Sequence, residues 1–169
     1  MEQKHAEYLY RFAESNDVAI LQEFLYLAIF IPPGQPSPPR ELLEHPEIRR
    51  YVSGWGQEHD RGVLAIEESG GTAVGAAWLR RLCGSERGYG YVDDKTPELT
   101  IAVRPEHRGK GVGTELMRRL LDIATQFYSA VSLSVDRLNP AMRLYSRLGF
   151  RVVMEQGEAV TMLWTPPLP

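Results

Sequence analysis

The fold is decided by the segment Val103-Arg-Pro-Glu-His-Arg-Gly-Lys-Gly-Val-Gly-Thr114. It follows a β-type run at residues 98–103 and precedes apolar residues at helical spacing over residues 112–127. Glycines let a backbone approach a ligand closely, and the start of a helix exposes N–H groups that have no intrahelical partner. The segment therefore predicts a strand–turn–helix that binds an anion, above all a phosphate, with Arg108 and Lys110 adding positive charge.

Two common nucleotide-binding patterns do not fit this segment. The chain contains no Gly-Lys-Ser/Thr, which excludes the P-loop pattern. A dinucleotide pattern that began at Gly109 would need glycine where Thr114 stands, and one that began at Gly111 would need it at Leu116. The pattern that does fit is Arg-x-x-Gly-x-Gly, after a strand that ends in Val-x-Pro.

Apolar periodicity and turn residues place the other elements around this segment. The unit from residue 98 to residue 135 is a strand, a helix and a strand, which should be parallel and right-handed. Five prolines between residues 32 and 40 predict an ordered surface loop. We expect a mixed α/β domain with strands at residues 7–12, 63–67, 72–79, 98–103, 130–135, 150–155 and 158–164, and helices at residues 17–31, 46–54, 112–127 and 139–149.

Composition limits the class of protein. The 169 residues suit one domain, and the lone Cys83 excludes a disulfide framework or a cysteine-rich zinc site. No run approaches the about 18 apolar residues of a membrane span, and residues 1–10 are too mixed and charged for a signal peptide. We therefore expect a soluble, cytoplasmic protein.

The charge is distributed unevenly along the chain. The net charge of −3 argues against a nucleic-acid partner. Residues 1–103 carry 10 basic and 16 acidic side chains, whereas residues 104–169 carry 9 basic and 6 acidic ones. This asymmetry suggests two partners of opposite charge, although halves of a sequence need not be halves of a molecule.

A second segment, Asn139-Pro-Ala-Met-Arg-Leu-Tyr-Ser-Arg-Leu-Gly-Phe150, accompanies the first. Together, and in the order of elements, they resemble the GCN5-related N-acetyltransferases, the GNAT superfamily. The resemblance implies one GNAT-type N-acetyltransferase domain over residues 1–169, with a mixed, mostly antiparallel twisted sheet of about seven strands. Four helices would flank this sheet, which would be splayed at the acyl-CoA site.

The implied function is that of an acyl-CoA-dependent N-acyltransferase. It would transfer acetyl from acetyl-CoA, its acyl-donor cosubstrate, to a primary amine by direct attack in a ternary complex. The acceptor would be a small-molecule amine or a peptide amine, and a homodimer is plausible. The alternatives are a non-catalytic acyl-CoA-binding or regulatory module, and a structural domain with a fortuitous glycine turn.

The resemblance also assigns roles to residues. The main chain of the strand before the turn would pair with the pantetheine arm, and the N–H groups of the turn would hold the pyrophosphate. A backbone N–H near Ala102 or Val103 could also stabilise the oxyanion. The predicted cofactor-binding residues are Ile101, Ala102, Val103, Arg108, Gly109, Lys110, Gly111, Val112, Gly113, Thr114, Asn139 and Tyr145.

Two residues are predicted to be catalytic. Tyr145 matches the family's general acid, and a phenol can donate a proton to a departing thiolate if it is held close. Glu98 is the candidate base for the acceptor ammonium, with a water relay as the alternative. Asn139 stands six positions before Tyr145, whereas the usual family spacing is seven, so Asn139 either contacts the cofactor or only caps the helix.

The remaining polar residues have plainer interpretations. Asp93 and Asp94 either attract a cationic substrate or form a solvated acidic loop. His45 and His107 have no partners at metal-ligand spacing, so no metal is predicted, and His107 is expected at the surface. Cys83 is expected to be structural. Aromatic residues could wall the acceptor pocket: Tyr26, Phe30, Tyr51, Trp55, Tyr89 and Tyr91.

Overall fold

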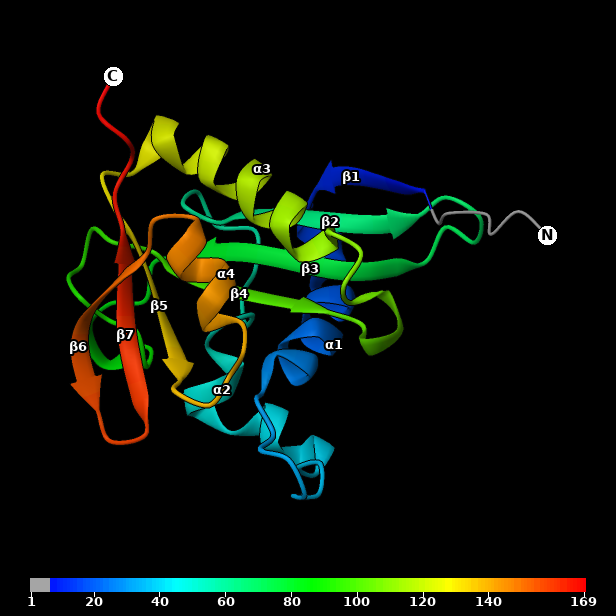
Figure 1. The fold of residues 1–169 in the computed structure, drawn as a ribbon, viewed down its shortest axis with the longest axis horizontal. Coiled ribbons are helices and arrows are strands. Elements are labelled where there is room, and N and C mark those ends of the chain that lie inside the picture. Colours follow the sequence, from blue (N-terminus) through cyan, green and yellow to red (C-terminus); the bar gives the residue numbers. More distant parts are fainter. Residues whose placement is uncertain (1–6) are drawn as a thin grey trace.

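A computed structural model describes residues 7–169, and its centre is one seven-stranded sheet (Figure 1). Residues 1–6, which belong to the signal-peptide and single-domain predictions, lie outside the described residues. The strand order is β1-β2-β3-β4-β5-β7-β6. The strands are β1 (Tyr8–Phe12), β2 (Arg61–Glu67), β3 (Ala73–Arg80), β4 (Glu98–Val103), β5 (Val131–Asp136), β6 (Arg151–Gln156) and β7 (Ala159–Trp164). The helices are α1 (Val18–Ala28), α2 (Pro46–Arg49), α3 (Val112–Phe127) and α4 (Met142–Arg147).

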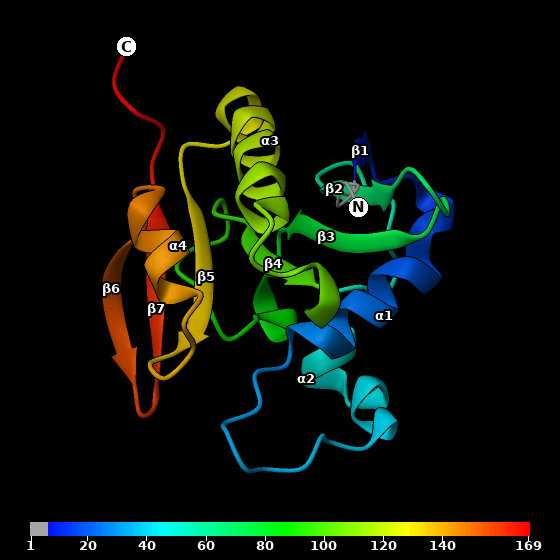
Figure 2. The ribbon, with the colours of Figure 1, turned by 45° about the vertical axis from the view of Figure 1, so that its right-hand side comes forward.

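The sheet is split between its two parallel strands. All other neighbouring strands are antiparallel, but β4 and β5 are parallel and share only the register pair Glu98↔Ser132. Beyond this pair the two strands diverge toward their carboxyl ends, as Figure 2 shows. The predicted mixed, mostly antiparallel sheet is confirmed, and its opening lies where α3 and α4 begin.

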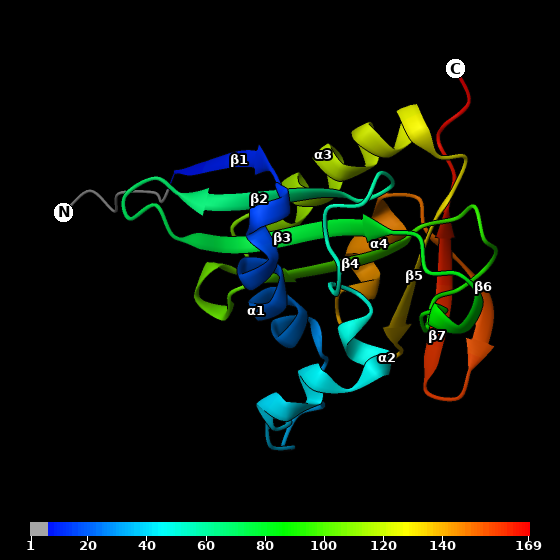
Figure 3. The same cartoon turned by 180° about the vertical axis from the view of Figure 1, so that it is seen from behind.

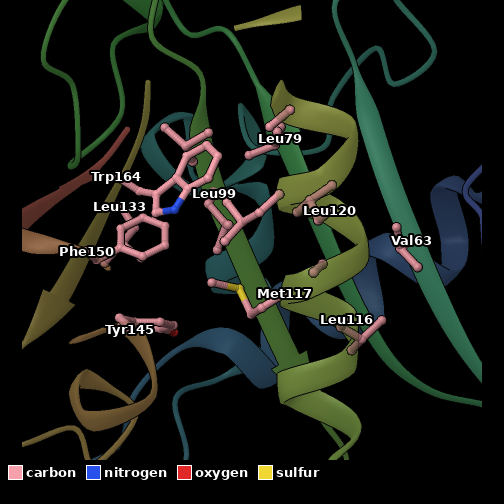
Figure 4. Close-up of a cluster of buried hydrophobic side chains, with 14 of the residues drawn as sticks. Val63, Leu79, Leu99, Leu116, Met117, Leu120, Leu133, Tyr145, Phe150 and Trp164 are labelled. Carbon is pink, nitrogen blue, oxygen red and sulfur yellow. The ribbon is translucent and has the colours of Figure 1, made fainter. Parts of the chain in front are cut away.

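Helices α3 and α4 cover one face of the sheet. The residues of α3 that repeat at helical spacing, Leu116, Met117 and Leu120, are fully buried against β2, β3 and β4 (Figure 4). Gly75 on β3 permits the close approach, because a Cβ there would lie 2.9 Å from Leu116 Cδ1. This packing fixes the start of α3 beside the end of β4.

Helices α1 and α2 cover the opposite face, as the view from behind shows (Figure 3). Leu21 and Phe24 of α1 are buried beside Trp78 of β3. The Trp78 indole donates a hydrogen bond to the Tyr51 carbonyl at 2.9 Å, which ties the end of α2 to the sheet. The split between β4 and β5 is therefore flanked by α3 and α4 on one face of the sheet and by α1 and α2 on the other.

The largest differences from the predicted element boundaries are in the helices. Helix α1 ends at Ala28 rather than at residue 31, because Ile29 is already extended before the prolines. The helix predicted over residues 46–54 is a single turn, Pro46–Arg49, and it follows a 3-10 turn at Arg40–Glu44 that the sequence did not predict. Helix α4 begins at Met142, after a hydrogen-bonded turn at residues 139–141. Within residues 7–169, no helix has the length and apolar character needed to cross a membrane.

Candidate functional site

The start of α3 offers a row of free backbone donors. Gly109 and Gly111 have φ values of 73° and 82°, a left-handed conformation that favours glycine. No side chain caps α3, and the first N–H with an acceptor is that of Glu115, which donates to the Gly111 carbonyl at 3.1 Å. Within residues 7–169, the N–H groups of residues 109–114 thus have no protein acceptor. A group of this kind fits an anion such as a pyrophosphate.

The predicted basic residues of the turn have different surroundings. Arg108 donates from Nε to the Val103 carbonyl at 3.0 Å, so its side chain closes the turn back onto β4. Lys110 is exposed. His107, expected at the surface, is instead half-buried, and its Nδ1 lies 2.9 Å from Tyr8 Oη in a hydrogen bond. His107 is thus only partly exposed, because Tyr8 of β1 packs against it.

The edge of β4 that faces the split is open. After Glu98, no residue of β4 pairs with β5, so the residues predicted to contact the pantetheine arm, Ile101, Ala102 and Val103, have no strand partner on that side. Gly113 lies at the meeting point of α3, β4 and α4, because a Cβ there would be 3.8 Å from Val103 Cγ2 and 3.7 Å from Leu144 Cδ2. An extended chain with amide groups could form hydrogen bonds with the unpaired backbone groups of β4 along this edge.

Tyr145 lies on the α3–α4 side of the sheet. Its side chain is 7% exposed and extends from α4 toward β4 (Figure 4), with its ring 6.0 Å from that of Phe150. Among the described residues, no group forms a hydrogen bond with its hydroxyl. Burial raises the pKa of Tyr145 to about 12, so the hydroxyl stays protonated at neutral pH.

Asn139 lies in the turn that leads into α4. Its side-chain oxygen accepts a hydrogen bond from the Ala141 N–H at 2.9 Å. This bond closes a turn before the helix, whereas the N-cap of α4 is Ala141 and has no side-chain cap. The prediction that Asn139 caps the helix was therefore wrong, because α4 begins only at Met142. Contact between Asn139 and a cofactor stays a prediction.

Glu98 lies on the opposite side of the sheet from Tyr145. Successive residues of a strand point to opposite faces, and the neighbouring Leu99 belongs to the core under α3. The Glu98 side chain is 2% exposed and its carboxylate accepts three hydrogen bonds: from Gly90 N at 2.8 Å, Gly88 N at 2.9 Å and Tyr51 Oη at 3.2 Å. The carboxylate therefore anchors the loop between β3 and β4.

The surroundings of Glu98 act on its pKa in both directions. Burial raises the pKa, and the hydrogen bonds from Gly90, Gly88 and Tyr51 offset part of the increase. The balance is a pKa above the ordinary value of 4.5. A carboxylate with a raised pKa is a better proton acceptor than an exposed glutamate.

The two aspartates of the same loop have structural contacts. Asp93 Oδ1 accepts hydrogen bonds from the N–H groups of Lys95 and Thr96. Burial raises the pKa of Asp93, but these bonds outweigh it and the net direction is downward. Asp94 accepts from the Tyr91 hydroxyl at 2.7 Å. Both carboxylates hold the loop in shape.

Cys83 and the histidines do not form a reactive group in the described chain. The Cys83 thiol donates a hydrogen bond to the Asp94 carbonyl at 3.4 Å, a contact within the loop between β3 and β4. Among residues 7–169, no three His, Cys, Asp or Glu side chains come together in a way that could hold a metal ion.

The sequence did not predict two side-chain contacts, Tyr51 with Glu98 and Tyr8 with His107. The sequence suggested Tyr51 only as a wall of the acceptor pocket, and its bond to Glu98 spans 47 positions of the chain. Tyr8 and His107 are separated by 99 positions. No local pattern indicates such pairs, because only the packing of the sheet brings them together.

Comparison with known proteins agrees with this geometry. The N-alpha-acetyltransferase RimI of Mycobacterium tuberculosis (strain ATCC 25618 / H37Rv) is 36% identical over 90 residues, which cover 50% of this chain. The match spans about half of the relative's length, 49%.

Two solved structures share the fold. The acetyltransferase of the GNAT family from Streptococcus pneumoniae has a TM-score of 0.63 at 19% identity, covering 95% of this chain and 100% of that one. The candidate acetyltransferase yncA from Salmonella typhimurium, solved with its cofactor acetyl-CoA, has a TM-score of 0.63 at 22% identity, covering 94% and 93%.

The family model described as Acetyltransferase (GNAT) family matches residues 25–150, which include the turn before α3, both sides of the split and all of α4. The chain belongs to the acetyltransferase (GNAT) family.

Proposed function

We propose that the protein is an acyl-CoA-dependent N-acetyltransferase that moves acetyl from acetyl-CoA to a primary amine by direct attack in a ternary complex. The observation that carries the proposal is the row of free N–H groups at residues 109–114, next to the unpaired edge of β4. The name of the RimI relative and the acetyl-CoA in the yncA structure support the same activity.

In this proposal the donor enters from the α3–α4 side. Its pyrophosphate accepts from the N–H groups of residues 109–114, with Arg108 and Lys110 nearby, and its pantetheine arm pairs with the main chain of Ile101, Ala102 and Val103. The thioester then lies in the split, where a backbone N–H of β4 can donate to the oxyanion. Tyr145 stands on this side and faces the sulfur, and contact of Asn139 with the donor belongs to the same proposal.

The acceptor reaches the thioester from the other face, where Glu98 lies. An amine such as that of lysine, with a pKa of about 10.4, is mostly charged at neutral pH and must lose a proton before it attacks. Glu98 accepts this proton directly or through a water molecule, the N–C bond forms, and the C–S bond breaks. Because Tyr145 and Glu98 lie on opposite faces of the sheet, acetyl-CoA and the amine can enter from different sides and meet at the split.

Tyr145 assists the departure of the sulfur. A thiol has a pKa of about 8.5, whereas burial raises the pKa of Tyr145 to about 12. The hydroxyl therefore acts first as a hydrogen-bond donor that stabilises the thiolate, and a proton passed to sulfur is recovered from solvent. Removal of this donor should slow the chemical step rather than weaken binding.

The experiment that tests the function has two arms. Calorimetric titration with acetyl-CoA should show binding, and a screen of amines, polyamines, amino acids and peptides should show amine-dependent release of CoA. Binding without turnover of any acceptor would point to an acyl-CoA-binding module instead. No binding at millimolar acetyl-CoA would contradict both.

Three broader expectations belong to the same proposal. A single domain over residues 1–169 is supported by the sheet, which joins β1 near one end of the chain to β7 near the other. A homodimer is supported by the edge strand β6, whose residues Val152, Val153 and Met154 are exposed, and light scattering in solution tests it. A cytoplasmic location is supported by the lone Cys83.

A further inference from the structure

A pocket of about 200 Å³ lies between α2 and the loop that joins β3 to β4. Its lining residues are Glu47, Arg50, Arg87, Gly88 and Tyr89. Gly88 separates the pocket from the Glu98 carboxylate: its N–H donates to Glu98 Oε2 at 2.9 Å, and a Cβ on Gly88 would lie 2.3 Å from Glu98 Oε1. The same Cβ would lie 2.5 Å from Tyr51 Oη, so the Gly88 backbone packs directly against both Glu98 and Tyr51.

Two arginines line this pocket, Arg50 and Arg87, and neither guanidinium group has a carboxylate partner among the described residues. Arg50 donates from Nε to the Pro46 carbonyl at 3.0 Å and from Nη1 to the Arg87 carbonyl. The Arg87 guanidinium lies 4.2 Å from the centroid of the Tyr91 ring. Among the described residues, neither forms a salt bridge. Both cations are held by carbonyl and aromatic contacts, so their charge is left for a ligand.

The single carboxylate of the lining is already engaged. Glu47 accepts a hydrogen bond from the Tyr89 hydroxyl at 2.9 Å. The Tyr89 N–H donates to Tyr51 Oη at 2.8 Å, and the two rings are stacked with centroids 6.5 Å apart. The pocket wall is thus connected to Glu98 through Tyr51, and its charge is one net positive unit.

We propose that this pocket holds the carboxylate of the acceptor, so that the substrate class is a small amine that carries a carboxylate beside its amino group, as free α-amino acids do. The inference rests on the proposed function. Arginine recognises carboxylates through paired N–H donors, and Arg50 and Arg87 can supply them. The amino group then points past Gly88 toward Glu98.

The size of the pocket agrees with a small acceptor. Pockets for drug-sized ligands have volumes of about 300–1,000 Å³, which is larger than the volume here. A peptide amine has its neighbouring carboxylate converted to an amide, so it would leave both guanidinium groups without an anion. The pocket therefore favours a free amino acid over a peptide N-terminus.

The test compares acceptors that share one side chain: L-leucine, L-leucinamide and isoamylamine, with matched serine and histidine series. Each is titrated into the CoA-saturated protein, and kcat/KM is measured with acetyl-CoA. In at least one series the free acid should bind about tenfold more tightly than its amide or its decarboxylated amine, the effect of a charge-assisted hydrogen bond.

Variants then assign the effect to the pocket. Arg87→Met should remove the preference for the acid and leave binding of the decarboxylated amine unchanged, and Arg50→Met should do the same. Because Arg50 also bonds to backbone carbonyls, Arg87→Met is the cleaner variant. Arg118→Met, on the exposed side of α3, is the matched control and should change nothing.

Several results would overturn the inference. In the acceptor series, these results are equal binding of acid, amide and amine, a preference for a peptide with a free N-terminus, or no binding of any free acid. In the arginine variants, the contradicting result is an equal loss of binding for all three acceptors. If amines without a carboxylate are acetylated well, the proposed function stands and only the acceptor class is wrong. If acetyl-CoA does not bind, the proposed function itself fails.

Discussion

Tyr51 donates a hydrogen bond to Glu98 across the boundary between the end of α2 and the start of β4, with 3.2 Å between Tyr51 Oη and Glu98 Oε1. Burial and the neighbouring Glu98 carboxylate raise the pKa of Tyr51 well above its ordinary value, so it remains a donor. The same oxygen accepts from the Tyr89 N–H at 2.8 Å. One tyrosine thus connects the candidate base to the wall of the pocket.

The first prediction concerns the pH dependence of Glu98. A base works when deprotonated, and burial raises the Glu98 pKa above 4.5, so kcat/KM should rise with pH through a limb that lies above this value. Glu98→Gln should abolish the limb and lower kcat by about 10²-fold. Glu86→Gln, on the exposed part of the same loop, should keep the wild-type profile. An unchanged limb in Glu98→Gln would show that another group is the base.

The second prediction concerns Tyr145. Tyr145→Phe keeps the ring that packs on Phe150 and removes only the hydroxyl, so the fold should persist. We expect kcat to fall by about 10²-fold while the KM for acetyl-CoA stays the same. Because the Tyr145 pKa is about 12, ionisation of this group should cause no loss of activity between neutral pH and about pH 10. Full turnover of the variant would exclude the role.

The third prediction concerns the turn before α3. Gly111 has a φ of 82° and open space where a Cβ would be, so Gly111→Ala adds backbone strain of ~1–2 kcal/mol without a clash. Relief of this strain would turn the N–H groups away from the pyrophosphate, and the KM for acetyl-CoA should rise about tenfold. Gly71→Ala meets the same strain in the β2–β3 turn, with a φ of 65° and open space, and should leave that KM unchanged.

The fourth prediction concerns the Tyr8–His107 pair. Tyr8→Phe removes the hydrogen bond that fixes His107 within the turn, worth ~0.5–1.5 kcal/mol. The KM for acetyl-CoA should rise about threefold to tenfold with kcat unchanged. Tyr10→Phe on the same strand, whose ring lies beneath Arg119, serves as the control. Equal behaviour of the two variants in steady-state kinetics would mean that the pair does not position the turn.

The fifth prediction concerns Gly90, which lies against the backbone of β5. A Cβ at this position would be 2.8 Å from Leu133 C and from Ser134 N, which are backbone atoms that cannot rotate away. Gly90→Ala should cost ~1–3 kcal/mol and lower Tm by about 2–4 °C for each kcal/mol. Gly70→Ala, whose nearest neighbour would be Thr72 Oγ1 at 3.6 Å, should leave the Tm unchanged. A wild-type Tm for Gly90→Ala would show that the loop can move off β5.

The sequence predicted the features that depend on local pattern. The strand at residues 98–103 and the helix at residues 112–127 have the predicted bounds, because alternation, helical spacing and the glycines act over short distances. Glu98 was identified by its place at the start of a strand, but not its partner Tyr51. That contact depends on how α2 packs against the sheet.

The proposed acceptor pocket was beyond prediction for a related reason. Helix α2 is one turn long, too short for a periodic pattern, and the loop at residues 81–97 is irregular. Arg50 and Arg87 stand 37 positions apart and meet only because the loop folds back across α2. Their charges are therefore visible in the sequence, but their proximity is not.

The central claim is that acetyl passes from acetyl-CoA to an amine within one complex. The most direct measurement incubates the protein with acetyl-CoA and a panel of amines, and quantifies free CoA and N-acetylated product by mass spectrometry. We predict that the two form in equal amounts, only when an acceptor is present, and without an acetylated form of the protein. Release of CoA that does not depend on an acceptor, or transfer through an acetylated residue of the chain, would contradict it.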